Sequence, residues 1–349
     1  MARQQVDSML AVALIVGAMF AAVPTAVQSM GVCYGPLGYN LPSSSQVVEL
    51  CKSVGIQGMR IYGPHKPTLD AMRNSGLGLL LDTGNDKVCE LAADPSSAAA
   101  LVRDFVAPYY PAVDIRHIAV GNELDGGGST QLCIVPAMRN VRAALADAGL
   151  AGAIRVSTSV SYYGVVRDAF PPSRGAFAAP YMADVARFLE TTGGPLLANV
   201  FPYFAYAGNP GGAVGLGFAT FRPGAATVTD PGNGLTYRNL FDAMVDGIYA
   251  ALDKAGAPNV SVVVSGSGWP SAGGFGASLE NARDYNQRLI NHTHGKDGPQ
   301  GTPRRPGRME TYVFSMFNED LKMGDPTVRH FGLFYPNETP VYPINFRID

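Results

Sequence analysis

Carboxylate, amide and aromatic residues follow directly after short apolar segments at several points of the chain. Glu123 is the clearest case, because residues 118–120 are apolar and Gly121-Asn122-Glu123 then place a carboxylate beside an amide. A carboxyl group shielded from water where a buried strand ends can keep its proton and act as a general acid. The same local sequence also fits a solvated glutamate just past a strand.

The other residues at the ends of apolar segments have the same character. Aromatic rings stack on the apolar faces of sugar rings, and amides and carboxylates bind hydroxyl groups, so the set favours a carbohydrate over a phosphate or an acyl group. No His, Asp or Glu cluster has metal-ligand spacing, and we expect neither a metal nor a cofactor. The residues are Tyr62, Asp82, Asn122, Ser159, Tyr203, Phe204, Trp269, Asn318 and Glu319.

Eight short apolar segments alternate with amphipathic helical stretches, which is typical of parallel βαβ units. Together with a uniform composition, this predicts an α/β protein with a single (β/α)8 TIM barrel, whose reacting groups stand at the C-terminal ends of the strands. The Gly- and Pro-rich residues 203–234 predict a small excursion on the rim. The expected strands are 31–34, 58–62, 77–81, 115–120, 154–159, 196–201, 260–265 and 311–317.

The N-terminal segment predicts export. Residues 1–29 combine a weakly basic start, an apolar run and small residues at a cleavage site, and we interpret them as a removed signal peptide. Residues 30–349 then form the barrel, a secreted protein of the cell exterior, cell wall or vacuole. With a net charge of −2 and no later run of membrane-spanning length, neither nucleic acid nor a membrane is an expected partner, and we expect a monomer.

Export would permit disulfide bonds and N-glycosylation, and the chain contains four cysteines and three glycosylation sequons. Cys33, Cys51, Cys89 and Cys133 allow three pairings in two disulfides, and one or two buried free thiols fit equally well. The sequons begin at Asn259, Asn291 and Asn337, of which Asn259 runs directly into a predicted strand.

Six motifs occur in order and at ordinary spacing between residues 31 and 346, and together they resemble plant glycoside hydrolase family 17, the endo-β-1,3-glucanases. The resemblance implies a (β/α)8 barrel, an open cleft for a β-1,3-glucan chain, and hydrolysis with retention by two glutamates. The motifs are Gly31-Val32-Cys33-Tyr34-Gly35, Met59-Arg60-Ile61-Tyr62, Gly121-Asn122-Glu123, Ala198-Asn199-Val200-Phe201-Pro202-Tyr203-Phe204, Gly268-Trp269-Pro270-Ser271 and Met316-Phe317-Asn318-Glu319.

Carried over residue by residue, the resemblance implies that Glu123 is the general acid/base. It implies that Glu319 and Lys322 support the charge of the site. The positions that match the substrate-binding cleft are Tyr62, Asn122, Phe201, Tyr203, Phe204 and Trp269.

One position departs from the family in a way that affects the chemistry. The family's nucleophile motif reads Val-Val-Ser-Glu-Ser-Gly-Trp-Pro, and here Gly266 stands where that glutamate would be, with its neighbours aligned without a gap. A retaining glycosidase needs two carboxyl groups about 5 to 5.5 Å apart, and glycine has no side chain that could attack. Ser265 and Ser267 are expected on the wrong sides of the strand's alternation to replace it.

The sequence therefore predicts an endo-β-1,3-glucanase by lineage whose hydrolysis is strongly impaired. The alternatives are a non-hydrolysing β-1,3-glucan-binding protein and a nucleophile-substituted variant of the glycosynthase type. Direct attack by water is a further route, with Glu319 as the motif-matched base. Phe201 and Val328 also differ from the family, which often has Tyr at the first position and an acidic residue at the second.

Overall fold

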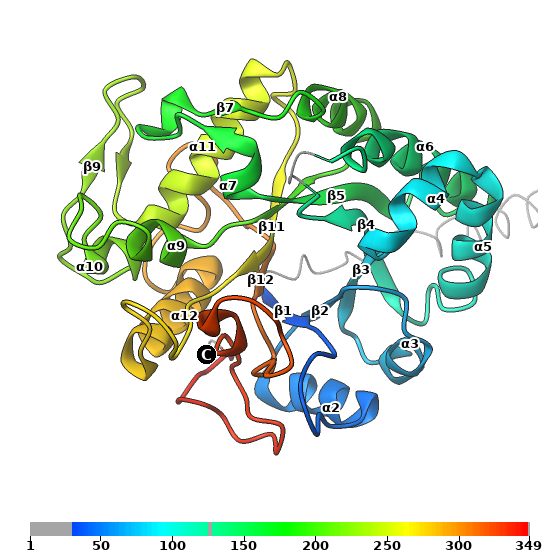
Figure 1. The fold of residues 1–349 in the computed structure, drawn as a ribbon, viewed down its shortest axis with the longest axis horizontal. Helices are drawn as coiled ribbons and strands as arrows, with labels where there is room; N and C mark the ends of the chain where they lie inside the picture. Colours follow the sequence, from blue (N-terminus) through cyan, green and yellow to red (C-terminus); the bar gives the residue numbers. More distant parts are fainter. Residues whose placement is uncertain (1–29, 125–127, 348–349) are drawn as a thin grey trace, which may run out of the picture.

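Eight parallel strands close into a barrel in a computed structural model that describes residues 30–124 and 128–347. Around the barrel the strands follow the order β1-β12-β11-β8-β5-β4-β3-β2 (Figure 1). Each of the eight predicted segments overlaps one of these strands, so the predicted (β/α)8 barrel is confirmed. The strands are β1 Met30–Tyr34, β2 Gly58–Ile61, β3 Gly78–Asp82, β4 Asp114–Asn122, β5 Arg155–Ser161, β8 Leu196–Asn199, β11 Val262–Ser267 and β12 Thr311–Val313. The predicted signal peptide lies outside the described residues.

Helices surround the barrel and cover the outer faces of its strands (Figure 1). Their ends follow ordinary capping chemistry: Ser43 and Ser278 cap α2 and α12, and Gly55 and Gly295 end the same helices in the left-handed conformation. The helices are α2 Ser44–Val54, α3 Lys66–Met72, α4 Val88–Ala93, α5 Pro95–Phe105, α6 Gln131–Asp147, α7 Tyr162–Val165, α8 Met182–Thr192, α9 Pro202–Ala207, α10 Leu216–Ala219, α11 Leu240–Lys254 and α12 Leu279–His294, with short 3₁₀ turns η1 Asn85–Lys87, η2 Pro172–Arg174 and η3 Pro326–Arg329.

The predicted excursion on the rim is present between β8 and α11. It contains α9, α10 and a small antiparallel pair, β9 Val228–Thr229 with β10 Thr236–Tyr237. A second antiparallel pair, β6 Val166–Arg167 with β7 Ala176–Phe177, lies between β5 and α8 and was not predicted. Strands of two residues leave no periodic pattern that a sequence could reveal.

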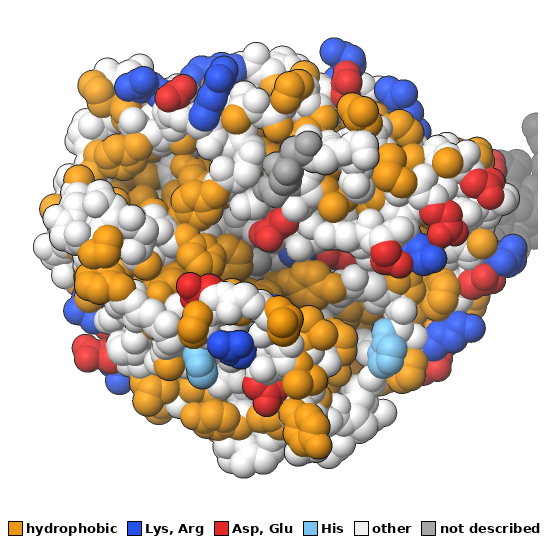
Figure 2. All heavy atoms as spheres, in the orientation of Figure 1, with side chains coloured by type: hydrophobic (Ala, Val, Ile, Leu, Met, Phe, Trp, Pro, Cys, Tyr) orange, Lys and Arg blue, Asp and Glu red, His pale blue; other side chains and the backbone are white. Residues whose placement is uncertain are grey.

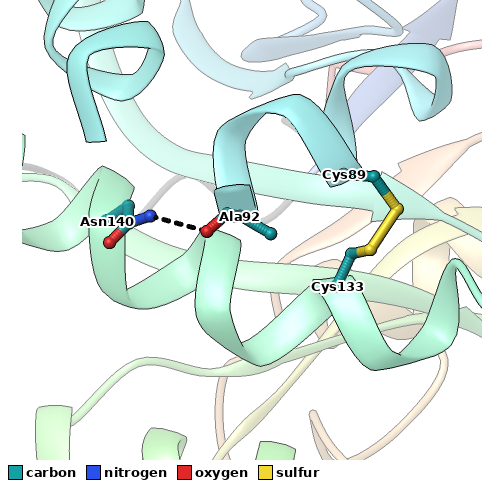
Figure 3. Close-up of a disulfide and its surroundings, with 4 residues drawn as sticks. All are labelled: Cys89, Ala92, Cys133 and Asn140. Carbon is teal, nitrogen blue, oxygen red and sulfur yellow. Dashed lines mark hydrogen bonds between the residues drawn. A yellow bond between two sulfur atoms is a disulfide. The ribbon is translucent and has the colours of Figure 1, made fainter. Parts of the chain in front are cut away.

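One disulfide joins Cys89 of α4 to Cys133 of α6, while Cys33 and Cys51 are buried free thiols (Figure 3). Of the alternatives left open by the sequence, the one with two buried free thiols is observed, beside a single disulfide. Beside the disulfide, the side chain of Asn140 donates to the carbonyl oxygens of Leu91 and Ala92 at 2.8 and 3.1 Å. These contacts fasten α4 to α6, the helix that follows the loop carrying Glu123.

The three sequons differ in their surroundings. Asn259 and Asn337 are exposed, and the side chain of Asn259 donates to Glu190. Asn291 lies within α12 and donates to Asp297, and the hydroxyl of its sequon residue Thr293 is buried against a carbonyl of the same helix. In the segments that the model describes, we find no helix long and apolar enough to cross a membrane.

Candidate active site

Glu123 follows the last residue of β4 in a backbone conformation that is uncommon for a residue with a side chain. Its φ is 54°, in the left-handed region, and its amide donates to the carbonyl oxygen of Ser159 at 2.8 Å. The carboxylate is exposed, and its Oε1 accepts a hydrogen bond from Nδ2 of Asn199 at 2.8 Å. The shielding predicted for this carboxyl group is therefore absent, because the group stands above the strand end rather than inside it.

Figure 2 shows a central hollow on this face of the molecule, with apolar and acidic side chains along it. It lies over the region where the labelled strands converge in Figure 1. The candidate site is thus at the end of the barrel where a (β/α)8 protein carries its reacting groups.

Below Glu123, a buried cation organises the polar groups inside the barrel. Arg60 has no exposed surface and forms an ion pair with Asp82, with Nη2 at 2.7 Å from Oδ2. Its other donors reach Asn122, Asn199 and the carbonyl oxygen of Ser265 at 2.7 to 2.9 Å. Burial raises the pKa of Asp82, and the adjacent guanidinium of Arg60 opposes that rise.

Asn199 connects this buried network to Glu123. Its Oδ1 accepts from Nη1 of Arg60 and from Oγ of Ser265, both at 2.9 Å. Its Nδ2 donates to Oδ1 of Asn122 and to Oε1 of Glu123. Because both ends of the amide are occupied, its orientation is fixed and it holds the carboxylate of Glu123 in one place.

Gly266 lies in β11, in register with Asn199 of the neighbouring strand β8. A Cβ atom added at Gly266 would lie 3.0 Å from Oδ1 of Asn199 and 3.7 Å from the ring of Phe201. Position 266 and Glu123 therefore flank the same amide. The backbone of Gly266 is not in the left-handed region, so a side chain is conformationally allowed there once Asn199 moves by a few tenths of an ångström.

The two serines beside Gly266 are buried and committed to other partners. Ser265 bonds to Asn199 inside the barrel, and Oγ of Ser267 lies 2.6 Å from the hydroxyl of Tyr285 in α12. They face different surroundings because the pairing of β11 with both neighbours is irregular between Val264 and Ser267. The prediction from strict alternation was therefore wrong in its reason, although neither hydroxyl is free to replace a carboxylate.

Of the six cleft positions implied by the resemblance, the aromatic ones divide into exposed and buried residues. Phe204 is 39% exposed, and Phe201 is half-buried with its ring 5.7 Å from those of Phe204 and Phe331. Tyr203 is only 2% exposed, and Trp269 is fully buried, with its Nε1 donating to the carbonyl oxygen of Gly276. Trp269 offers no surface to a ligand, since Tyr203, Tyr206 and Tyr285 enclose it.

Tyr62 and Asn122 are half-buried at the barrel end and touch the Arg60 network. The guanidinium of Arg60 lies 4.6 Å from the ring centre of Tyr62, and Asn122 accepts from Arg60 and Asn199. Cys33 lies beneath them, where burial raises the pKa of its thiol to about 11, and Sγ donates to the carbonyl oxygen of Ser265. The thiol therefore remains protonated.

Glu319 and Lys322 form an ion pair, as the resemblance implied for a charge-supporting pair. Glu319 is 3% exposed, and Nζ of Lys322 also lies 4.2 Å from the ring centre of Phe314. A Cβ at position 35 would collide with Oε1 of Glu319 at 2.2 Å, so Gly35 is required for this carboxylate to occupy its place.

Several residues that hold the site were not singled out by the sequence. Arg60 and Asn199 belong to quoted motifs but received no role, and Asn85 was missed entirely. Asn85 exchanges two hydrogen bonds with the backbone of Asn122, at 2.7 and 2.9 Å. An arginine inside an otherwise apolar strand was the available signal for Arg60, because a buried charge requires a partner. No group of three potential metal ligands occurs in the parts of the chain covered by the model.

Comparison with known proteins agrees with this geometry. Residues 30–346 match the family model of glycosyl hydrolases family 17. The glucan endo-1,3-beta-glucosidase GII of Hordeum vulgare is 60% identical over 346 residues, which cover 99% of this chain and all of that protein. The acidic isoform of glucan endo-1,3-beta-glucosidase from Zea mays is 53% identical over 348 residues, with the same shares covered.

A solved structure is similar over nearly the whole barrel. A β-1,3-glucanase and allergen of Cryptomeria japonica pollen superposes with a TM-score of 0.87 at 42% identity, covering 92% of this chain and all of that one. With a family match over almost its whole length, relatives above 50% identity and the same closed barrel, the chain belongs to glycosyl hydrolases family 17.

Proposed function

We propose that this protein is an endo-β-1,3-glucanase by lineage that still binds β-1,3-glucan but hydrolyses it very poorly. The observation that carries the proposal is the contrast across Asn199. On one side Glu123 presents an oriented carboxyl group, and on the other side position 266 presents only a glycine. The names of the relatives support β-1,3-glucan as the ligand.

The chemistry of retention explains why one carboxyl group is insufficient. One group protonates the leaving glycosidic oxygen while the other attacks the anomeric carbon and forms a covalent glycosyl-enzyme, which water later hydrolyses. Glu123 can donate and recover the proton, but nothing at Gly266 can form the second bond. Loss of a nucleophile in another hydrolase costs about a millionfold in turnover, or roughly 8 kcal/mol of transition-state stabilisation.

The substitutes considered from the sequence are all unfavourable. Ser265 and Ser267 are buried and hydrogen-bonded elsewhere. Glu319, the candidate base for direct attack by water, is almost fully buried and paired with Lys322. Activation of water by this carboxylate would require breaking that ion pair, which supports impaired hydrolysis over a rerouted reaction.

A paired experiment tests the proposal. Release of reducing ends from a linear β-1,3-glucan and binding of a β-1,3-gluco-oligosaccharide are measured for the unmodified protein, Gly266→Glu and the uncharged control Gly266→Gln. We expect similar binding in all three and a gain of up to about a millionfold in turnover in Gly266→Glu alone. Comparable turnover in the unmodified protein and Gly266→Glu would refute the proposal, as would loss of oligosaccharide binding in the unmodified protein.

The space at Gly266 supports a second candidate activity, synthesis from an activated donor. With an α-glucosyl fluoride, the leaving fluoride would occupy the side of the sugar where a nucleophile normally stands, while Glu123 accepts the proton of the attacking acceptor hydroxyl. The products are a β-linked oligosaccharide and hydrogen fluoride. Absence of oligosaccharide product while the donor is shown to bind would exclude this activity.

Secretion, the monomeric state and N-glycosylation belong to the same proposal. Asn337 is the best placed of the three sequons, because it is exposed and its Oδ1 accepts from both the amide and the hydroxyl of Thr339. N-terminal sequencing and intact-mass measurement of protein secreted from plant cells test the cleavage after residue 29 and the occupancy of each sequon. Light scattering tests the monomer.

A further inference from the structure

A cavity with a volume of about 960 Å³ lies outside the barrel, apart from the site described above. It is an open cavity lined by residues of the rim excursion, the start of α11, one face of α12 and the loop of residues 297–306. None of its lining residues belongs to the network of Arg60, Asn199 and Glu123. Its volume is at the upper end of the range for small-molecule sites.

Basic side chains dominate the charge on the cavity wall. Arg222, Arg238, Arg288 and His292 all line it. Arg222 already pairs with Asp284 and Glu280, and Nε2 of His292 lies 2.9 Å from Oδ1 of Asp242. Because Asp242 is already paired with His292, it does not neutralise Arg238 or Arg288.

Arg238 and Arg288 have no acidic partner among the residues described by the structure. The side chain of Arg238 is exposed, whereas Nε of Arg288 is buried and has no hydrogen-bond acceptor there. The remaining acidic residue of the wall is Asp297, which is exposed and accepts a hydrogen bond from Asn291. Two guanidinium groups on one wall, one with a buried donor unsatisfied, are suited to an oxyanion such as a carboxylate.

The rest of the wall indicates what carries that carboxylate. Phe221 and four prolines contribute apolar surface, against which the faces of sugar rings can pack. Thr227 and Gln300 add polar groups for hydroxyls. A free phosphate ion would use the guanidinium groups but leave most of a cavity of this volume unoccupied. The prolines are Pro223, Pro299, Pro303 and Pro306.

We propose that this cavity, which we call the arginine cavity, is a second carbohydrate site that binds an acidic oligosaccharide through Arg238 and Arg288. The carboxylate of a uronic acid residue accepts from the guanidinium groups, and its ring faces lie against the apolar wall. The site is separate from the glucan cleft and independent of the residue at position 266. Such a site would hold the protein on an acidic polysaccharide while the barrel mouth stays free for a neutral glucan.

Calorimetric titration of the full chain with trigalacturonate at low ionic strength tests the proposal. We expect binding that is unaffected by saturating β-1,3-gluco-oligosaccharide and weakened about tenfold or more in Arg238→Gln and in Arg288→Gln. Arg187→Gln, which removes an exposed arginine paired with Asp184 on α8, is the matched control and should bind like the unmodified protein. Arg238 is exposed, so its variant reports on binding even if Arg288→Gln lowers stability.

Four outcomes would overturn the proposal: no detectable binding, equal binding in the Arg238 and control variants, displacement by the neutral oligosaccharide, and inorganic phosphate binding as tightly as trigalacturonate. The last would identify a general anion site rather than a saccharide site. The two proposals can fail separately. If the barrel mouth does not bind the neutral glucan, trigalacturonate can still bind, and if the arginine cavity does not bind trigalacturonate, the neutral oligosaccharide can still bind.

Discussion

The two sides of the barrel mouth differ in how completely they are built. On the side of β4, Glu123 is held by its own backbone hydrogen bond to Ser159, by Asn199 and, through Asn122, by Asn85. On the side of β11, the strand, its irregular pairing and the two serines are present, but Gly266 has no side chain. The first side presents an oriented carboxylate, and the second has the strand framework but no side chain at position 266.

The difference shows that the scaffold does not depend on a carboxylate at position 266. The oxygen of Asn199 nearest to Gly266 already accepts hydrogen bonds from Arg60 and Ser265, so removing a side chain leaves no buried polar group unpaired. The proposed retaining chemistry, in contrast, requires a carboxylate at that position. Under the proposed function, this glycine has little effect on folding and a large effect on turnover.

Removing the carboxylate of Glu123 should have the largest effect on turnover, but only in a variant in which a carboxylate has been restored at position 266. In the Gly266→Glu background, Glu123→Gln should lower turnover by about 10²- to 10⁴-fold, because general acid catalysis is lost while shape is kept. In the unmodified protein the same substitution should change the residual rate very little, since residues that act as a unit are not additive. Single-turnover kinetics of the unmodified protein, the two single variants Glu123→Gln and Gly266→Glu, and the double variant measure both effects. A large loss in the unmodified protein would mean that Glu123 works without a partner carboxylate.

The buried network shared by both sides should matter next, through stability. Arg60→Met leaves Asp82 buried and unpaired, and we expect a loss of about 3 to 5 kcal/mol in the free energy of unfolding. Denaturant unfolding measures this loss. The control is Arg187→Met, which removes an arginine from an exposed ion pair with Asp184 and should cost less than about 1 kcal/mol. A loss as small as that of the control would show that the network is not needed to hold the strands.

The disulfide fastens only the Glu123 side. It closes a loop with a sequence separation of 44 residues, and removing it in the Cys89→Ser/Cys133→Ser double variant should cost about 2 to 4 kcal/mol by loop entropy. In the Gly266→Glu background, turnover should fall more than oligosaccharide binding, because the loop that orients Glu123 loses a fixed end. Unchanged stability and turnover would assign that role to Asn85 and Asn140 alone.

The smallest effect is expected on the outer wall of the Gly266 side, where α11 and α12 are tied together. Burial lowers the pKa of His292, but its hydrogen bond and charge interaction with Asp242 outweigh burial and raise the pKa above its ordinary value. Stability from this pair is therefore fully present below about pH 6.5 and is lost as the pH rises through the raised pKa.

In thermal unfolding between pH 5 and pH 9, His292→Gln should remove the part of the stability that is present at low pH and lost as the pH rises. The exposed His65, mutated in the same way, serves as the control. A pH dependence that is the same in His292→Gln and the unmodified protein would contradict this assignment.

Much of the fold could be predicted because its signals are local. Eight apolar segments, the Gly- and Pro-rich rim and the helix caps are each encoded within a few residues, and the barrel follows from their alternation. The site was predicted less completely, because Trp269 and Tyr203 received a cleft role that their burial does not support.

The errors share one physical cause, which is that exposure and partners are properties of the packed molecule. The sequence favoured a shielded Glu123, but the residue is exposed and follows β4 in the left-handed conformation. Strict alternation predicted the directions of Ser265 and Ser267, but irregular pairing in β11 changed them. Neither feature leaves a mark in residue type.

By itself, the sequence determined the barrel, the place of Glu123 at a strand end and the missing carboxylate at Gly266, because each depends on residue type and order along one strand. Only the tertiary structure decided which cysteines pair, that Asn199 links Glu123 to position 266, and that Arg60 lies at the centre of the buried network. It also decided that Arg238 and Arg288, which have no acidic partner among the described residues, share a cavity. These facts join residues 22 to 205 positions apart, and such contacts are fixed only when the strands close.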